Sequence, residues 1–312
     1  MMMLTPIVNV NLALNKTWLF LSVFIIGFSL TADLVFSETK AGVALDSFSV
    51  RVKGDGNPVI LIPGLMSDGS IWRDVEKHLA RRYQVHTLSL AGFAGTPHIA
   101  EPSLTKVKKE LMAYIEKESL LKPALIGHSL GGFLAMSLTI DAPDKFGPLV
   151  SVDGLPFIGP VFTQSNATTV ASLSNQAIQM KNHVAQLSPE KLQEHVRIGV
   201  RRQATGQHNQ ALVIEMAGKS DPYTVAHMMY ELMSMDLRSD LNFIEQPLLV
   251  IGASGAIPEA EQVHVQSLYA ETLAAKPDTR LLMNRMSRHF VMLDQPEWLS
   301  KTLIEFLKET TL

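Results

Sequence analysis

Cysteine is absent from the 312 residues of the chain. Its absence excludes disulfide bonds, iron–sulfur clusters and thiol catalysis, and it is compatible with any cellular compartment. The ten histidines include no pair spaced four residues apart on one helical face, which is the pattern of helical zinc sites. We therefore expect a protein that uses no metal ion and no organic cofactor.

The chain also lacks an excess of charge of either sign. It has 27 basic and 30 acidic side chains, a net charge of −3, and no cluster of lysine or arginine. A nucleic-acid partner is therefore not expected, because such proteins concentrate positive charge on one face. With 46% hydrophobic and 18% charged residues, the composition is that of an ordinary globular protein with a sizeable core.

Long apolar runs are scarce, and the most apolar stretch lies near the N-terminus. "TWLFLSVFIIGFSL" (17–30) follows Lys16 and is too short for a comfortable membrane span. Val35 and Ser37 stand three and one residues before a possible cleavage point, as in a secretory signal peptide. We predict a signal peptide over residues 1–37 and an exported, periplasmic or secreted protein with no stable membrane association after cleavage. An uncleaved N-terminal membrane anchor is the alternative.

After residue 45, strand-like and helix-like patterns alternate. The predicted strands are 47–52, 58–64, 83–90, 123–129, 147–154, 247–254 and 279–286, and the helical patterns between and after them cover 70–82, 103–119, 131–142 and 296–309. Most of these strands are apolar on both faces, as expected in a parallel sheet covered by helices on both sides. The order predicts an α/β fold with a mostly parallel sheet.

One interval interrupts this alternation. Residues 156–240 contain helical patterns but no convincing strand, and two of those helices begin with the start signals Ser188-Pro189 and Asp221-Pro222. We predict a helical cap over 156–240, inserted into a core made of 38–155 and 241–312. Five methionines fall in this interval, namely Met216, Met228, Met229, Met233 and Met235. They fit either an adaptable apolar ligand pocket or ordinary packing between helices.

The segment "LIGHSLGG" (125–132) passes from a buried strand directly into a helix. Ser129 stands at the junction between Gly127 and Gly131. With no room for a loop, the junction residue must adopt a strained backbone, and the glycines let strand and helix pass without Cβ clashes. This is the G-x-S-x-G nucleophile elbow, which presents a serine hydroxyl at the carboxyl end of the sheet.

Together with two further segments, this motif resembles the α/β-hydrolase superfamily, in particular its esterase-like members with a helical cap. "VILIPGLMSDGSIW" (59–72) is similar to the family's oxyanion-loop segment, with Pro63 in place of the usual histidine. "RHFVMLDQPEWLSKTLIEFL" (288–307) is similar to its C-terminal histidine segment. The resemblance covers nearly all of residues 45–309 and implies an α/β-hydrolase fold.

Serine needs a positioned base to take its proton. His289 is the candidate base because it follows the last predicted strand and precedes the final helix. The oxyanion of a tetrahedral intermediate needs backbone N–H donors. Leu130, directly after the serine, and Leu65, after Gly64, are the candidate donors. His128 is expected to pack and form hydrogen bonds rather than act as the base.

Two residues are candidates for the acid that orients the histidine. Many relatives carry an aspartate after the strand equivalent to 247–254, but Gly255 stands there. Our first choice is Asp153, near the end of the predicted strand 147–154, which follows the strand that leads into Ser129. This choice keeps the chain order Ser, Asp, His. The alternative role of Asp153 is turn formation before Gly154. Glu259 is the second choice for the acid.

The prediction is a serine hydrolase that cleaves small-molecule carboxylic esters through an acyl-enzyme. An acyltransferase, a lactonase or a peptidase on the same fold remain alternatives, since fold does not fix substrate. A non-catalytic protein that uses the pocket to bind a ligand is a further alternative. The sequence identifies no substrate-binding residues.

Overall fold

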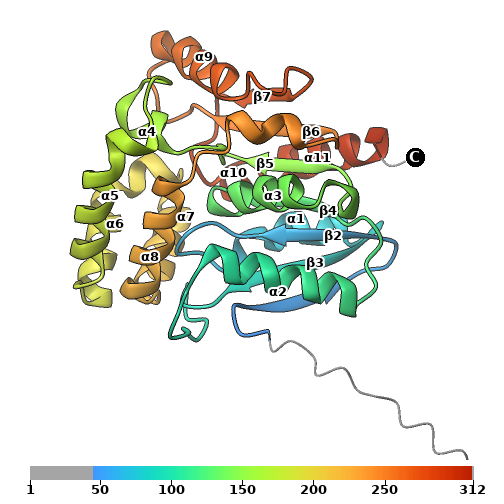
Figure 1. The fold of residues 1–312 in the computed structure, drawn as a ribbon, viewed down its shortest axis with the longest axis horizontal. Helices are drawn as coiled ribbons and strands as arrows, with labels where there is room; N and C mark the ends of the chain where they lie inside the picture. The colour runs from blue at the N-terminus through green and yellow to red at the C-terminus, as the bar shows by residue number, and fades with distance from the viewer. Residues whose placement is uncertain (1–44, 311–312) are drawn as a thin grey trace, which may run out of the picture. The chain divides into compact units, whose positions relative to one another are not determined.

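The computed structural model describes residues 45–310, so the predicted signal peptide lies outside the described residues. Within that range, seven strands form a single sheet (Figure 1) in the order β1-β3-β2-β4-β5-β6-β7. Strand β1 runs antiparallel to β3, and every other neighbouring pair is parallel. The predicted α/β fold with a mostly parallel sheet is therefore confirmed.

The strands are short and lie close to their predicted positions. Their bounds are β1 Phe48–Lys53, β2 Asn57–Ile62, β3 Tyr83–Leu90, β4 Ala124–His128, β5 Leu149–Val152, β6 Leu248–Ala253 and β7 Arg280–Asn284. The ends of several predicted segments fall outside the hydrogen-bonded ladders. For example, Gly147 and Pro148 precede β5 and do not belong to it.

The helices comprise α1 Arg73–Leu79, α2 Leu104–Lys117, α3 Leu130–Asp141, α4 Gly159–Thr163, α5 Val170–Val184, α6 Pro189–Gln203, α7 Gln207–Gly218, α8 Pro222–Ser234, α9 Gln262–Thr272, α10 Val291–Asp294 and α11 Pro296–Thr310. Short 3-10 turns cover Gly69–Trp72, Pro143–Lys145, Ser239–Phe243 and Glu259–Glu261. Several helices begin at a side-chain cap: Ser103 accepts from Lys106 N–H, and Asp221 accepts from Thr224 N–H.

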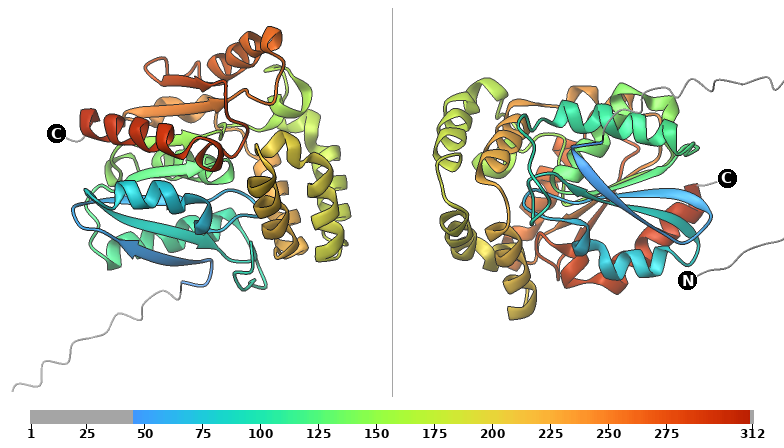
Figure 2. Two further views of the ribbon diagram at one scale, coloured as in Figure 1. Left: turned by 180° about the vertical axis from the view of Figure 1, so that it is seen from behind. Right: turned by 90° about the horizontal axis from the view of Figure 1, so that it is seen from below.

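The sheet separates two apolar clusters. Along β2, Ile60 and Ile62 face the cluster that contains α2 and α3, whereas Val59 and Leu61 face the cluster that contains α1 and α11. This alternation follows from the two-residue period of a strand. Figure 1 shows α2 and α3 on one side of the sheet, and the view from behind shows α1 and α11 on the other (Figure 2).

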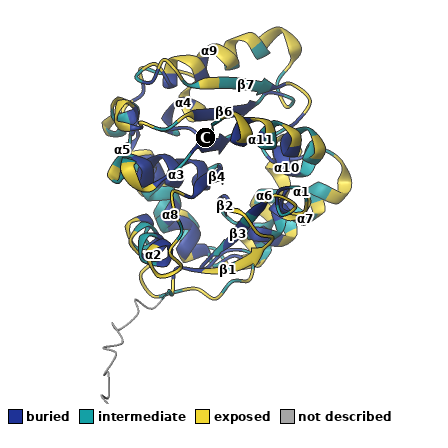
Figure 3. Cartoon of the chain, turned by 90° about the vertical axis from the view of Figure 1, so that its right-hand side faces the viewer, coloured by how far each residue is buried: buried dark blue, intermediate teal, exposed yellow. Residues whose placement is uncertain are grey.

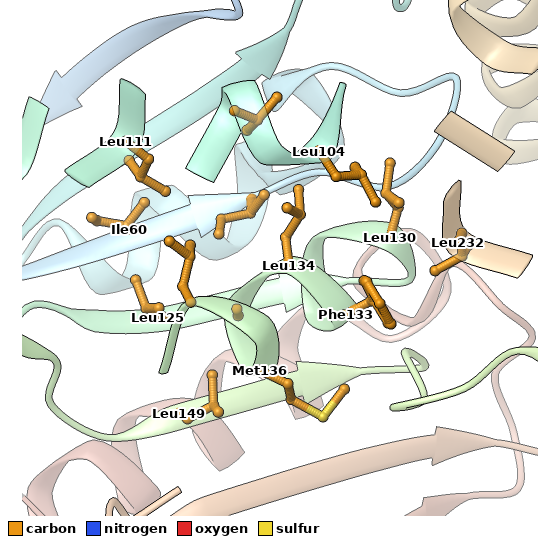
Figure 4. Close-up of a cluster of buried hydrophobic side chains, with 14 of the residues drawn as sticks. Ile60, Leu104, Leu111, Leu125, Leu130, Phe133, Leu134, Met136, Leu149 and Leu232 are labelled. Carbon is orange, nitrogen blue, oxygen red and sulfur yellow. The ribbon is translucent and has the colours of Figure 1, made fainter. Parts of the chain in front are cut away.

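Figure 4 shows the first of these clusters, in which side chains of α2 and α3 meet those of β2, β4 and β5. Leu232 reaches the same cluster from α8. When the chain is coloured by burial (Figure 3), the strands are mostly buried and the exposed residues lie on the outer faces of the helices. The central strands β2–β6 are apolar on both faces because helices cover both, whereas the edge strands β1 and β7 are more exposed.

Helices α4–α8 all lie between β5 and β6 in the chain, with no strand between them in the described structure. Figures 1 and 2 show α5–α8 grouped at one end of the sheet. The segment is bonded to the rest of the protein at several points. Asp221 N–H donates to Gly92 O at 2.7 Å, Leu104 N–H donates to a Glu231 carboxylate oxygen at 2.7 Å, and Phe290 N–H donates to Gln203 O at 2.9 Å. The exact limits of a cap domain stay a prediction.

No helix among residues 45–310 combines the length and the apolar character that a membrane span requires.

The glycines of the elbow allow a test of the packing. A Cβ on Gly127 would lie 2.1 Å from the carbonyl carbon and oxygen of Gly131 and 2.4 Å from Gly132 N, all of them backbone atoms. We expect Gly127→Ala to lower the free energy of unfolding by about 3 kcal/mol, because the strand and helix must move apart. Urea unfolding followed by circular dichroism measures this.

Gly199 in α6 is the matched control, because a Cβ there would meet nothing within 4 Å. Gly199→Ala should leave stability unchanged or raise it by up to about 1 kcal/mol, since alanine favours helix. Equal stability losses in the two variants would contradict the close approach at Gly127.

Candidate active site

Ser129 occupies the sharp turn between β4 and α3. Its backbone has φ 52° and ψ −116°, a region that is strained for a residue with a side chain. Every residue from 123 to 139 is buried except Ser129, which is partly exposed. The turn therefore exposes one hydroxyl from an otherwise buried strand and helix.

The flanking glycines explain how this turn can form. A Cβ on Gly131 would lie 2.3 Å from Ile62 O, so α3 passes against the end of β2 only because that side chain is missing. Gly127 is equally close to the backbone of α3. The sequence argument for two obligatory glycines agrees with this geometry.

His289 lies in the loop between β7 and α10, and Asp153 lies directly after β5. His289 Nδ1 donates a hydrogen bond of 2.6 Å to Asp153 Oδ2. Asp153 has φ 51°, a left-handed conformation that aspartate tolerates better than most residues. Since Nδ1 carries the proton in this bond, a neutral His289 has its lone pair on Nε2.

The other oxygen of Asp153 is also fully engaged. Oδ1 accepts from Tyr269 Oη at 2.7 Å and from Ala253 N–H at 2.7 Å. Burial, and then the charge of Asp153, raise the pKa of the Tyr269 hydroxyl well above its usual value. Tyr269 therefore remains a proton donor, and the carboxylate is held in one orientation by three donors.

The structure does not bring Glu259, the second-choice acid, to the histidine. Glu259 is exposed in the Glu259–Glu261 turn, while the Nδ1 of His289 is occupied by Asp153. At Gly255, where relatives carry an acid, a Cβ would lie 2.6 Å from Ser287 O. Any side chain at position 255 would therefore collide with the backbone that leads to His289.

His128, next to Ser129, is buried beneath His289. Its Nε2 donates to His289 O at 3.0 Å, and the two rings have centroids 4.5 Å apart. Burial, and then the nearby His289, hold the pKa of His128 well below its usual value, so its ring is neutral. The expectation that His128 packs and forms hydrogen bonds agrees with this arrangement.

Two backbone amides lie beside the serine. Leu130 is the first residue of α3, so its N–H has no partner within the helix. Leu65 lines the same cavity as Ser129. Among the hydrogen bonds of residues 45–310, neither the Leu65 nor the Leu130 N–H donates to another group of the chain. Both amides are available to a bound oxygen.

Ser129, Asp153 and His289 line one cavity of about 660 Å³. Most of its other walls are apolar and come from the residue before α4, from α4–α8, from the loop after β6 and from α9, including Ile158, Val161, Leu192, Val213, Met229, Leu232, Ile257 and Val265. Of the five methionines singled out in the helical interval, Met229 lines the cavity, Met216, Met228 and Met233 are buried in the packing between elements, and Met235 is partly buried against the first apolar cluster.

The Ser129 hydroxyl and the His289 ring share the cavity without a hydrogen bond between them in the described structure. Catalytic hydrogen bonds of this kind are often long before substrate binds. The described residues also contain no cluster of three or more histidine or acidic side chains that could hold a metal ion.

Several polar residues of the site gave no signal in the sequence. Tyr269 lies on α9, a helix that the apolar periodicity did not predict, and its partner Asp153 is 116 residues away. Arg202, Gln203 and Arg288 also line the cavity. Arg288 stands directly before His289, and that position could have marked it as a residue of the site.

Comparison with known proteins agrees with this architecture. Residues 59–302 match the model of the alpha/beta hydrolase family. The chain is 24% identical over 212 residues to a pimeloyl-[acyl-carrier protein] methyl ester esterase of Nitrosomonas europaea, a match covering 66% of this chain and 79% of that protein.

A second enzyme of the same name, from Aliivibrio fischeri, is 27% identical over 106 residues, which is 34% of this chain. The chain spans only about two fifths (40%) of the length of that relative. Among solved structures, a thermophilic esterase from Thermogutta terrifontis superimposes with a TM-score of 0.69 at 19% identity, covering 84% of this chain and 93% of the other. This likeness concerns the fold.

The family model spans most of the chain, from residue 59 to residue 302. The chain therefore belongs to the alpha/beta hydrolase family.

Proposed function

We propose that the protein hydrolyses carboxylic esters through an acyl-enzyme on Ser129, with His289 as general base and acid and Asp153 as the orienting carboxylate. The observation that carries this proposal is the 2.6 Å bond between His289 Nδ1 and Asp153 Oδ2, in a cavity that the Ser129 side chain also lines. The esterase names of the matched relatives support the choice of ester substrates.

In the first half-reaction, Ser129 Oγ attacks the carbonyl carbon while His289 Nε2 takes the hydroxyl proton. The resulting imidazolium is stabilised by Asp153 across the Nδ1 bond. Collapse of the tetrahedral intermediate breaks the bond to the alcohol oxygen, which receives the proton from Nε2. The alcohol leaves, and the acyl group remains as an ester of Ser129.

In the second half-reaction, a water molecule attacks the acyl carbon and gives a proton to His289 Nε2. The second tetrahedral intermediate expels Ser129 Oγ, which takes that proton, and the carboxylic acid leaves. The amides of Leu65 and Leu130 stabilise the oxyanion in both intermediates, because both donors are free and lie beside the serine. This chemistry uses no metal ion and no organic cofactor.

The apolar lining suits the acyl group of a small to medium ester, since apolar walls with few polar groups are typical of small-molecule sites. The helical segment over 156–240 acts in this proposal as a cap, because α4–α8 supply much of the wall that faces Ser129.

The first prediction concerns the nucleophile. A fluorophosphonate probe should label the wild type at Ser129, and the wild type should hydrolyse a series of p-nitrophenyl esters with a preference set by acyl length. Ser129→Ala should lose both labelling and all but about one part in 10⁶ of the turnover. Mass spectrometry of the labelled peptide and initial rates measure these.

Ser67→Ala is a suitable control, because Ser67 also lines the cavity but lies outside the proposed triad. Labelling retained in Ser129→Ala, or lost in Ser67→Ala alone, would contradict the assignment. A wild type that is folded but neither labelled nor active would favour the ligand-binding alternative.

The second prediction concerns the acid. Asp153→Asn keeps an acceptor for Tyr269 and Ala253 but places an amide N–H₂ opposite His289 Nδ1. The amide N–H₂ can donate only to a ring nitrogen with a lone pair, so the proton of the neutral ring moves from Nδ1 to Nε2. Nε2 can then no longer accept the proton of Ser129. We expect kcat on p-nitrophenyl acetate to fall about 10³–10⁴-fold, as removal of the correct tautomer does in other triads.

Glu259→Gln is the matched control for Asp153→Asn, because it removes the one other acid considered and lies in an exposed turn. Its kcat should stay within about twofold of the wild type. The assignment fails if Asp153→Asn is folded and fully active, or if Glu259→Gln shows the larger loss.

We also propose that the protein is exported by an N-terminal signal peptide that ends at Ser37. The support is the apolar stretch after Lys16 and the small residues at the cleavage point. Expression in a bacterial host followed by N-terminal sequencing of the periplasmic fraction should give a chain that begins at Glu38. Full-length protein retained in the membrane fraction would favour the anchor alternative, and Met1 on a cytoplasmic form would contradict export.

A further inference from the structure

The charges that line the cavity are unbalanced. Asp153 is the one acidic side chain among its described lining residues, and both of its oxygens are already engaged by His289, Tyr269 and Ala253. Two arginines, Arg202 and Arg288, are among the lining residues of the same cavity, the first of them exposed and the second half-buried. Neither forms an ion pair with a carboxylate within residues 45–310. The cavity thus holds positive charge that the protein itself does not neutralise.

Arg288 is the more constrained of the two. Its Nη1 donates to Ala204 O at 3.0 Å, just beyond the C-terminal end of α6. Its Nε is buried and has no hydrogen-bond partner. An arginine has five N–H donors, and a buried donor without an acceptor costs free energy unless a ligand or water satisfies it. Because Nε is closed to solvent, the donors that a ligand can meet are those of Nη1 and Nη2, which form a planar fork that matches the two oxygens of a carboxylate.

The backbone on both sides of this guanidinium is fixed. Arg288 N–H donates to Asp294 Oδ2 at 2.9 Å, and Phe290 N–H donates to Gln203 O at 2.9 Å. Arg288 is therefore anchored between the histidine loop and the end of α6, where Arg202 also reaches the cavity. Arg288 and His289 are neighbours in the chain, so one peptide unit fixes the separation of their backbones.

A purely structural role for Arg288 is to cap the last carbonyls of α6, where a cation is favoured by the helix dipole. That role accounts for Nη1 and Ala204 O. It does not account for a second arginine on the same cavity with no acid opposite either of them. A bound anion would account for this pair of arginines.

We propose that the cavity selects esters whose acyl group carries a carboxylate, and that Arg288 binds this carboxylate with support from Arg202. This inference rests on the proposed esterase function and names its substrate class: half-esters of dicarboxylic acids or related anionic acyl groups. The ester carbonyl lies at Ser129, the apolar walls take the methylene chain, and the guanidinium groups take the far end.

The test compares matched methyl esters that differ only at the end of the acyl chain. Monomethyl succinate, adipate and suberate are paired with methyl butyrate, hexanoate and octanoate, and methanol release gives kcat/KM for each. For at least one chain length, we expect the wild-type kcat/KM to be about tenfold or more higher for the carboxylated ester than for its neutral partner, chiefly because KM is lower. A charge-assisted hydrogen-bonded pair supplies a preference of this size.

Arg288→Met should bring the ratio of the carboxylated to the neutral ester close to one. Arg288→Lys should keep part of the preference, because it retains the charge but not the fork. Arg202→Gln should reduce the ratio by less than Arg288→Met. Arg201→Gln is the matched control: Arg201 is exposed like its neighbour Arg202 but does not line the cavity, and its substitution should leave the ratio unchanged. A merely structural role would lower both rates together and leave the ratio as in the wild type.

A binding measurement keeps this inference separate from the proposed function. Ser129→Ala should bind monomethyl suberate more tightly than methyl octanoate in isothermal titration calorimetry, and Ser129→Ala with Arg288→Met should lose that difference. Arginine-dependent binding in a protein that hydrolyses none of the esters would overturn the esterase proposal and retain the anion site. Equal or weaker binding of the carboxylated ester, or an unchanged preference in Arg288→Met, would overturn the anion site.

Discussion

The turn at Ser129 is the constraint on which the other parts of the site depend. A buried parallel strand must become a buried helix with no intervening loop, and the chain does so with a non-glycine residue at φ 52°. Such a conformation is kept only where the surroundings leave no alternative. Here β2 on one side and the start of α3 on the other enclose the turn so closely that Gly127 and Gly131 have no room for a Cβ. The burial of two large apolar clusters against the sheet stabilises the fold, and this stabilisation keeps the backbone of Ser129 in its strained conformation.

The same turn also positions the histidine. His128, the residue before Ser129, donates from its ring to the carbonyl of His289, and Phe290 packs against the His128 ring at a centroid distance of 4.8 Å. His128 can do this because burial keeps it neutral, with its proton on the nitrogen that faces the carbonyl. Strand β4, through His128, therefore fixes the backbone of the loop that carries His289. Asp153 fixes the orientation of the His289 ring.

Much of this arrangement could be predicted from the sequence. The strands show as short apolar runs, and Ser129 and His289 follow from their places in the order of elements. The acid could not be chosen with confidence, because what favours Asp153 is spatial: Tyr269 and Ala253 hold its second oxygen, and Ser287 O leaves no room for a side chain at Gly255. In helix α9 the buried residues are only Leu268, Tyr269 and Thr272, so its apolar periodicity is too weak to predict a helix. The contacts of Arg288 depend on α6, more than 80 residues earlier in the chain.

The end of α6 joins the helical segment to the catalytic loop. Gln203 O and Ala204 O accept from Phe290 N–H and Arg288 Nη1, and Thr205 donates from both its backbone and its hydroxyl to Asp294. Asp294 in turn accepts from Arg288 N–H, so one carboxylate holds both segments. A shift of α6 would move the loop on both sides of His289. In the proposed mechanism, the wall that would contact the substrate and the base that would act on it are therefore held by one set of hydrogen bonds, so that binding energy gained at the wall can align the base.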